Sequence, residues 1–207
     1  MEYGSECARG AEATITEGMF IGREVMVKHR PPKGYRIPEL DSRIRSSRTR
    51  SEARLMHEAR LAGVRTPCIF DIDLKESTIV MERIRGTTVK DVLDSDPGRA
   101  DEICRMIGAE VAKMHSARIC HGDLTTSNMI MTDDGSLCII DFSMGCSRAD
   151  VEEMGVDIRL LERAFTSAHT DIVGSLDVLM DAYYAGIPNP DAVRKKVEDI
   201  KNRGRYT

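Results

Sequence analysis

Hydrophobic and polar residues alternate along several short segments in the first third of the chain. Residues 11–16 and 24–28 show the alternation that predicts half-buried β-strands. Short, mainly apolar segments at residues 69–74 and 78–81 predict two more strands. The Pro- and Gly-rich residues 31–38 predict a loop after the first pair. The N-terminal third is therefore expected to form a β-sheet.

A second pattern, with apolar residues three or four positions apart, accounts for most of the remaining chain. This spacing predicts amphipathic helices, and Gly63 is placed to end the first of them. The change from strands to helices predicts a β-rich N-terminal lobe at residues 1–84 and a helical C-terminal lobe at residues 85–207. The expected fold class is α+β. The predicted helices cover residues 39–62, 100–115, 149–165, 171–184 and 191–201.

Two apolar runs near the middle of the chain lie between polar residues that suit phosphoryl transfer. Residues 129–131 and 137–140 are apolar, and the Asp-Asp-Gly sequence between them predicts a β-hairpin. The hairpin would bring Asn128, at its start, next to Asp141, at its end. Asp123 precedes Asn128 by five residues. In phosphoryl transfer from a nucleotide, one carboxylate orients the attacking group, while an amide oxygen and a second carboxylate bind Mg²⁺.

Each of these polar residues has an expected role. Asp123 is the predicted catalytic residue, which orients the nucleophile and accepts its proton late, because an unperturbed Asp has a pKa near ~4. Asn128 and Asp141 are the predicted Mg²⁺ ligands, since both offer the hard oxygen atoms that this ion prefers. His115 and His121 are expected to be structural.

Lys28 is the second predicted catalytic residue. It ends the run Val-Met-Val-Lys, which resembles the strand lysine of protein kinases that contacts the α- and β-phosphates of ATP. Such a lysine needs a carboxylate partner, and helical spacing favours Glu52 over Glu58. A surface lysine is the alternative, and the downstream motif favours the catalytic role. Asp157, in a predicted buried helix, is expected to hydrogen-bond the loop around Asp123; a solvent-facing Asp is equally compatible with the sequence.

Further segments complete a predicted nucleotide site. Gly10 and Ala11 retain part of a glycine-rich phosphate loop, although a plain turn explains Gly10 equally well. Met81 is expected to line the back of an adenine pocket, and backbone groups of Glu82 and Ile84 to bind the base. An ordinary strand end is the alternative at this position. The predicted cofactor contacts are these five residues together with Lys28, Glu52, Asn128 and Asp141.

The composition is that of an ordinary globular protein, with 207 residues of which 41% are hydrophobic and 31% charged. No apolar stretch approaches the length of a membrane span, and the N-terminal residues lack a signal-peptide pattern, so a cytoplasmic location is expected. The six cysteines never form a C-x-x-C pair and several lie in apolar runs. Buried free thiols are therefore favoured over disulfides or a zinc site.

The net charge of −4 conceals an uneven distribution. Residues 23–60 carry a net charge of +6, so the rest of the chain carries −10. The two basic patches are the helical residues 43–54 and the tail at residues 201–207. A solvated helix face is one explanation, and an anionic partner such as nucleic acid is the other. Because aromatic residues make up 4% of the chain and Trp is absent, any such binding is expected through phosphate contacts.

Taken together, these motifs resemble the protein kinase superfamily, and within it the small atypical kinase family of the KEOPS (EKC) complex, which is PRPK-like and related to the RIO kinases. The likeness spans nearly the whole chain. It implies a protein kinase-like two-lobe fold with a shortened C-terminal lobe, and it supports Glu52 as the partner of Lys28. The likeness rests on residues 10–13, 28–30, 33–36, 40–41, 48–54, 121–128, 161–165 and the basic tail.

The resemblance also implies an activity and partners. The activity is that of an ATPase and atypical serine/threonine protein kinase that uses ATP and Mg²⁺. The implied partners are the threonylcarbamoyl-transferring subunit and other KEOPS subunits, in support of threonylcarbamoyl-adenosine formation in tRNA. The helix at residues 43–54 and the tail at residues 201–207 would then contact tRNA or these partners, and no membrane is involved.

The sequence departs from ordinary protein kinases in three places. Sixty-six residues follow Asp141 and contain no Ala-Pro-Glu segment. A standard peptide-binding platform is therefore not expected, which favours ATP hydrolysis or phosphorylation of a docked partner. Thr125 stands where such kinases often carry a lysine, and Ser143 replaces the glycine after Asp141-Phe142. None of these changes removes a predicted metal ligand.

Two other functions remain compatible with the motif. Small-molecule phosphotransferases of the aminoglycoside or choline kinase type also use His-Gly-Asp followed by Asn, but they need a large acidic lobe for a cationic substrate. A non-catalytic nucleotide-binding pseudokinase module is the second alternative. The intact set Lys28, Asp123, Asn128 and Asp141 argues against the latter, because pseudokinases usually lack one of these residues.

Overall fold

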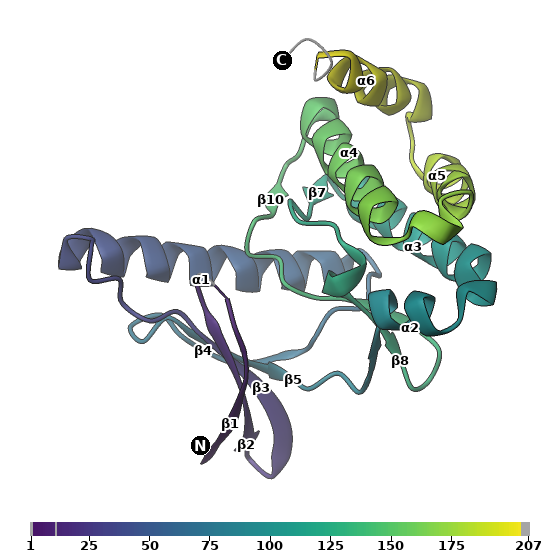
Figure 1. Cartoon of the computed structure of the whole chain (residues 1–207). Helices are drawn as coiled ribbons and strands as arrows, with labels where there is room; N and C mark the ends of the chain where they lie inside the picture. Colours follow the sequence, from purple (N-terminus) through teal and green to yellow (C-terminus); the bar gives the residue numbers. More distant parts are fainter. Residues whose placement is uncertain (1, 11, 204–207) are drawn as a thin grey trace.

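The computed structural model describes residues 2–10 and 12–203. In this part of the chain, the N-terminal region forms a five-stranded antiparallel sheet with the strand order β1-β2-β3-β5-β4 (Figure 1). The strands are β1 (Glu2–Arg9), β2 (Thr14–Phe20), β3 (Arg23–His29), β4 (Ile69–Asp73) and β5 (Thr78–Glu82).

The first hairpins of this sheet differ from the sequence prediction. β2 begins at Thr14 and continues to Phe20, so the strand predicted at residues 11–16 begins too early and ends too soon. β1 was not predicted. β2 and β3 are joined by Ile21 and Gly22, whose φ angles of 50° and 72° are those of a two-residue type I′ turn. That turn sets the register in which β3 pairs with β2.

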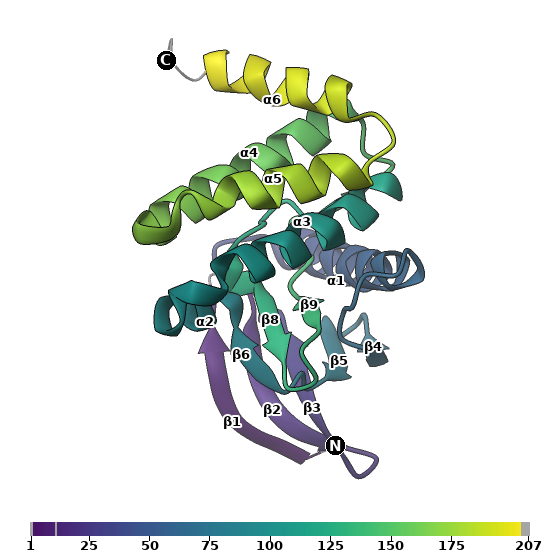
Figure 2. The same ribbon diagram turned by 90° about the vertical axis from the view of Figure 1, so that its right-hand side faces the viewer.

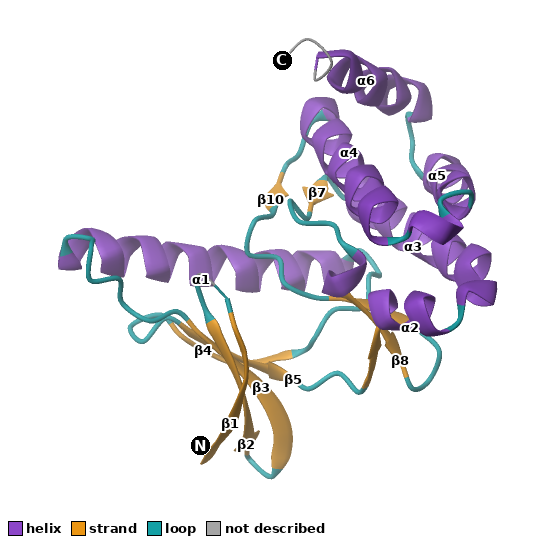
Figure 3. Cartoon of the chain, in the orientation of Figure 1, coloured by secondary structure: helices purple, strands orange, loops and turns teal. Residues whose placement is uncertain are grey.

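Helix α1 (Pro38–Leu61) lies across one face of the sheet, as the purple helix above the orange strands in Figure 3 shows. Pro38 occupies its first turn, where a missing N–H is not needed, and the acidic Glu39 and Asp41 complement the helix dipole there. The buried side of α1 is apolar near its end, at Leu55 and Met56, and carries the polar Asp41, Thr49 and Glu52 before that. The predicted helix at residues 39–62 matches α1 to within one residue at each end.

The C-terminal part is mainly helical, and Figure 2 shows its longer helices stacked above a small sheet. The helices are α2 (Val89–Ser95), α3 (Ala100–Ser116), α4 (Val151–Ala168), α5 (Ser175–Gly186) and α6 (Pro190–Arg203), with 3-10 turns η1 (Pro97–Arg99), η2 (Thr126–Asn128) and η3 (Thr170–Ile172). The small sheet has the order β6 (Gly86–Thr88), β8 (Met129–Thr132) and β9 (Leu137–Ile139), and β7 (Ile119–Cys120) pairs with β10 (Cys146–Ser147). α5 begins later than the helix predicted at residues 171–184, because η3 and a turn precede it, and it extends to Gly186.

One hydrophobic core joins α1 to the C-terminal helices. Leu55, Met56 and Ala59 of α1 belong to the same buried cluster as residues of α3, α4, α5 and α6. α3 and α5 approach closely at Gly108, where an added Cβ would lie 2.3 Å from the backbone oxygen of Leu179. The N-terminal sheet has a separate small cluster of Val25, Val27 and Val80 on its other side.

The α+β fold class, with a β-sheet N-terminal region and a helical C-terminal part, is confirmed. The domain boundary between residues 84 and 85 stays a prediction; it falls between the end of β5 at Glu82 and the start of β6 at Gly86. Among the helices of the described residues, none is both long and apolar enough to cross a lipid bilayer.

Candidate active site

Lys28 lies at the centre of a buried group of charges. In β3 the side chains alternate, so Val25 and Val27 face one side of the sheet while Lys28 faces the other. The Lys28 Nζ lies 2.7 Å from Glu52 Oε1 and 2.7 Å from Asp141 Oδ1. Lys28 and Glu52 are both almost fully buried. The strand, α1 and the segment after β9 therefore meet at one ammonium group.

Arg30 adds a second buried cation, which was not predicted from the sequence. Its Nη2 lies 2.5 Å from Glu52 Oε2, and its Nη1 donates a hydrogen bond of 3.3 Å to Thr49 Oγ1. Arg30 follows Lys28 by two residues, so the strand period of two places both on the same face. Glu58, the other candidate partner for Lys28, instead lies 3.8 Å from Arg54 Nε. Each oxygen of Glu52 thus contacts a different cation.

Asp123 and Asn128 lie together in the loop before β8. The Asn128 amide Nδ2 donates to the backbone oxygen of Asp123 and to its Oδ2, both at 2.9 Å. The turn η2 makes this contact possible because it reverses the chain between the two residues. The backbone oxygen of Asn128 accepts a 3.0 Å hydrogen bond from the Ile140 N–H, which places the predicted hairpin beside Asp141.

Asp157 of α4 binds the backbone of this loop. Its carboxylate accepts hydrogen bonds from the backbone N–H groups of His121 at 2.7 Å and Gly122 at 2.9 Å, and it is 2% exposed. His121 is buried, and its Nε2 lies 2.9 Å from the backbone oxygen of Ile140. His115 Nε2 also lies 3.3 Å from Asp157 Oδ2. The structure thus places Asp157 under the loop, and both histidines make internal hydrogen bonds.

Asp141 is held as a carboxylate by its neighbours. Burial alone would raise the pKa of Asp141, but the Lys28 ammonium and the Ser143 hydroxyl outweigh it and lower the pKa to about 2. The Ser143 Oγ donates to Asp141 Oδ1 at 2.5 Å. Asp141 has a φ of 64°, which turns the chain sharply at the end of the hairpin. Its side chain is 40% exposed, so the charged group remains accessible from solvent.

A pocket of about 350 Å³ lies beside these charges. It extends from Lys28, Asn128 and Asp141 to the segment after β5, so the structure brings eight of the ten predicted site residues to it or next to it. Of these eight residues, Asp123 does not line the pocket. It lies next to the pocket because its carboxylate accepts a hydrogen bond from the amide of Asn128. The lining residues are Cys7, Ile15, Glu17, Met26, Lys28, Glu52, Pro67, Met81, Glu82, Arg83, Ile84, Asn128, Ile130, Ile140 and Asp141.

The segment after β5 has an unused backbone donor at Ile84, which lines the pocket. The Ile84 N–H has no hydrogen-bond partner among the described residues, as binding of a base would require. The Glu82 side chain does not point freely into the pocket, because its oxygens bond Arg65 Nη2 at 2.6 Å and the Cys68 N–H at 3.0 Å. The Gly10 N–H donates to the Ala13 oxygen at 2.9 Å, and Gly10 does not line the pocket. Ala11 lies outside the described residues.

The oxygen atoms that remain free suit a hard divalent cation. Because Asn128 uses its amide nitrogen toward Asp123, its Oδ1 has no hydrogen-bond partner within the described chain. Lys28 and Ser143 both contact Oδ1 of Asp141, and its Oδ2 is likewise without a partner there. One amide oxygen and one carboxylate oxygen match the donor set that Mg²⁺ takes from proteins beside phosphates. The residues present therefore fit this ion.

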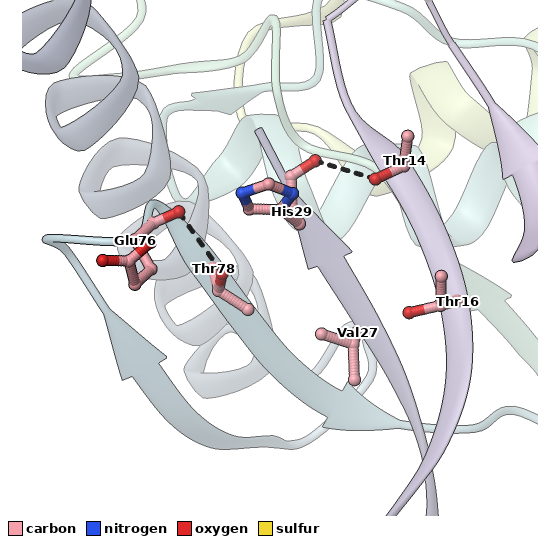
Figure 4. Close-up of a pocket in the computed structure, with 6 residues that line it drawn as sticks. All are labelled: Thr14, Thr16, Val27, His29, Glu76 and Thr78. Atoms are coloured by element: carbon pink, nitrogen blue, oxygen red, sulfur yellow. Dashed lines mark hydrogen bonds between the residues drawn. The ribbon is translucent and has the colours of Figure 1, made fainter. Parts of the chain in front are cut away.

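A second pocket, of about 310 Å³, lies on the other side of β3 and contains none of the predicted site residues (Figure 4). It is lined by Thr14, Thr16, Val27, His29, Glu76 and Thr78. The Thr14 and Thr78 hydroxyls donate to backbone oxygens of His29 and Glu76, both at 3.4 Å. Its lining has one carboxylate and no lysine or arginine, so it lacks the groups that bind a nucleotide triphosphate.

Comparison with known proteins identifies the family. The model of the RIO domain family matches residues 35–174, which is well over half of the chain. The chain belongs to the RIO domain family. Its sequence is 41% identical to the KEOPS complex subunit Bud32 of Pyrococcus abyssi over 210 residues, covering 96% of this chain and 94% of that protein. The EKC/KEOPS complex subunit Tp53rkb of Mus musculus is 36% identical, with 95% and 85% covered.

Two other comparisons concern the fold of this chain and the part of a longer relative that it matches. The Rio2 kinase of Chaetomium thermophilum, in a complex with ADP, Mg²⁺ and phosphoaspartate, superimposes with a TM-score of 0.69 over 100% of this chain at 14% identity, which confirms the kinase-like fold. A probable bifunctional tRNA threonylcarbamoyladenosine biosynthesis protein of Methanothermobacter thermautotrophicus is 42% identical over 200 residues. This chain spans 36% of the length of that relative.

Proposed function

We propose that this chain is a Mg²⁺-ATP-dependent phosphotransferase of the RIO type, which hydrolyses ATP or phosphorylates a docked protein on serine or threonine. The observation that carries the proposal is the contact of one buried lysine, Lys28, with both Glu52 and Asp141, in a pocket shared with Asn128. A positive charge next to free oxygen atoms is what a polyphosphate with its metal ion requires.

In this proposal each side chain acts on the reacting groups in a defined way. A bound Mg²⁺-ATP supplies the phosphoryl group and the neutralising divalent charge. Lys28 donates to phosphate oxygens, and Glu52 keeps its ammonium in place. Asp123, fixed by the Asn128 amide, orients the attacking hydroxyl or water. The backbone of Ile84 binds the base.

We also propose that the chain works as a subunit of a KEOPS-type assembly. The support is the names of its relatives, which are those of KEOPS subunits and of a bifunctional protein of threonylcarbamoyladenosine biosynthesis. The remainder of that bifunctional relative then corresponds to a protein that this chain contacts, which we take to be the threonylcarbamoyl-transferring subunit. On this basis the assembly acts in the cytoplasm, and tRNA is the molecule that it modifies.

The surface proposed for tRNA is narrower than the sequence indicated. Two arginines of the basic segment at residues 43–54 already form ion pairs within the chain: Arg45 pairs with the buried Asp41, and Arg48 pairs with Glu12 at the surface. Within residues 43–54, the exposed arginines are Arg43, Arg50 and Arg54. In the tail, Arg203 lies 3.1 Å from Glu152, and residues 204–207 lie outside the described residues.

The proposal is tested by Mg²⁺-dependent ATP turnover of the purified chain, alone and with a threonylcarbamoyl-transferring partner and tRNA. We expect Asp123→Ala to lower turnover by about 10²–10⁴-fold while ATP still binds. Asp141→Ala removes a proposed Mg²⁺ ligand and is expected to abolish Mg²⁺-dependent turnover. Asp133→Ala, at an exposed position of the nearby hairpin turn, is the matched control and should leave turnover unchanged. ATP binding by the wild type without turnover under any condition would instead support a non-catalytic module.

A further inference from the structure

His169 connects the end of α4 to the loop that carries the proposed metal ligand. Its ring is 4% exposed, and its Nε2 lies 2.8 Å from Thr126 Oγ1. On the other side of the ring, Nδ1 lies 3.6 Å from Asp94 Oδ1 of α2. The ring also packs against Phe165 at a centroid distance of 5.0 Å. A single buried histidine thus contacts α4, α2 and η2.

The contacts of the ring define which atom donates. Burial lowers the pKa of His169, against the opposing effect of Asp94, so the neutral ring is favoured at neutral pH. A neutral ring with its proton on Nδ1, toward Asp94, leaves Nε2 as an acceptor for the Thr126 hydroxyl. Thr126 is itself 4% exposed, so water is not a ready substitute for this bond.

Thr126 is the first residue of the turn that ends at Asn128. Within this turn the Asn128 N–H donates to the Thr125 oxygen at 3.0 Å, and the Asn128 amide reaches back to Asp123. A shift of Thr126 would therefore move the oxygen of Asn128 and the carboxylate of Asp123 together. Groups that orient a ligand-bearing side chain in this way commonly change metal affinity or activity by 10–100-fold when they are removed.

We infer that His169 is a positioning residue for phosphoryl transfer: its bond to Thr126 holds η2 in the geometry in which Asn128 binds the metal ion and Asp123 meets the nucleophile. The inference rests on the proposed function, which it deepens by assigning a residue that directly follows α4 and is far in sequence from the motif. His169 touches neither nucleotide nor metal and acts through Thr126.

The test compares variants that keep or remove the acceptor atom. His169→Phe retains a ring for packing against Phe165 but has no acceptor, whereas His169→Gln can offer an amide oxygen near the position of Nε2. Thr126→Val removes the hydroxyl at constant volume. We expect His169→Phe and Thr126→Val each to lower kcat by about tenfold, with the KM for ATP changed less than about threefold, and His169→Gln to recover most of kcat.

The double variant shows whether the two residues act along one path. If they do, His169→Phe combined with Thr126→Val is no slower than either alone, rather than about a hundredfold slower. A second readout is the Mg²⁺ concentration that half-saturates ATP binding in calorimetry, which should rise about tenfold in both single variants while metal-free ATP binding stays constant. A purely structural role would lower the melting temperature and leave these values unchanged.

Each outcome decides the inference. Multiplicative losses in the double variant, or unchanged kcat and Mg²⁺ dependence in the single variants, would overturn it while leaving the proposed function intact. A wild type that binds ATP without turnover would defeat the proposed function, and the Mg²⁺ dependence of ATP binding then decides the role of His169. If His169→Phe does not fold, Thr126→Val carries the same measurements.

Discussion

At the scale of single residues, Glu52 is the anion that two buried cations share. Its oxygens lie 2.7 Å from Lys28 Nζ and 2.5 Å from Arg30 Nη2, and the three side chains are at most 5% exposed. Loss of one member of such a group leaves a charge buried without compensation. Glu52 therefore supports the fold as well as the orientation of Lys28.

We expect Glu52→Gln to lower the free energy of unfolding by about 3–5 kcal/mol, because the amide removes the negative charge and leaves both cations in place. Urea denaturation at neutral pH measures this loss. Glu58→Gln, on the same helix but 37% exposed and 3.8 Å from Arg54, is the matched control, with a cost below about 1 kcal/mol. Equal losses in the two variants would contradict a buried ion network.

The sequence predicts those site residues that belong to short fixed motifs. Asp123, Asn128 and Asp141 could be found because their spacing and the turn between two apolar runs define one loop and one hairpin. Arg30 was missed, although the strand period places it on the face of Lys28. His169 carried no local signal at all, since its contact with the site depends on how α4 packs.

At the scale of elements, the loop before η2 passes very close to the segment after Asp141. Gly122 has a φ of 78°, and a Cβ at this position would lie 2.2 Å from the backbone oxygen of Met144. The same residue donates its N–H to Asp157. A side chain here must therefore displace one of two backbone segments that both carry site residues.

Gly122→Ala is expected to destabilise the protein by clearly more than the ~1–2 kcal/mol that a left-handed backbone costs an alanine, because of the added clash. Gly135→Ala is the control: its φ is 82° and no atom lies within 4 Å of the added Cβ, so only the backbone cost applies. The midpoint of urea denaturation compares the two. If the variants lost equal stability, the close approach at Gly122 would not matter.

Long elements with a clear period were predicted well, and short ones were not. α1 and α3 each match a predicted helix closely because many apolar positions repeat along them. α2 has seven residues, and β7 and β10 have two each, so no period can be detected. β7 pairs with β10 so that Cys120 lies opposite Cys146 in the backbone ladder, and the fold brings these distant segments together.

At the scale of the whole molecule, the basic charge is divided between internal and exposed arginines. Arg45 bonds Asp41 at 2.7 Å and the backbone oxygen of Arg30 at 3.1 Å, so it fastens α1 to the end of β3. Arg43 and Arg50 are exposed and have no ion-pair partner in the described part of the chain. The charge of the sequence showed that residues 43–54 are basic, but it could not separate the internal arginines from the exposed ones.

Charge reversal of the exposed set, Arg43→Glu with Arg50→Glu and Arg54→Glu, should weaken tRNA binding and make it less dependent on salt. Each lost phosphate contact lowers the slope of log K against log[salt] by about 0.7–0.9, so the total change is about 2–3. Binding titrations at several salt concentrations measure the slope. Arg105→Glu, at an exposed position of α3, is the control, and an unchanged slope in the triple variant would exclude α1 as the contact surface.

The core that α1 shares with the C-terminal helices has a consequence for how the protein loses its structure. Because Leu55, Met56 and Ala59 belong to that core while Glu52 holds Lys28 from the same helix, the sheet cannot separate from the helices without exposing both. Melting is then a single cooperative event in which the charge network and the fold disappear together. A fragment cut between the sheet and the C-terminal helices would keep neither the charge network nor a stable fold.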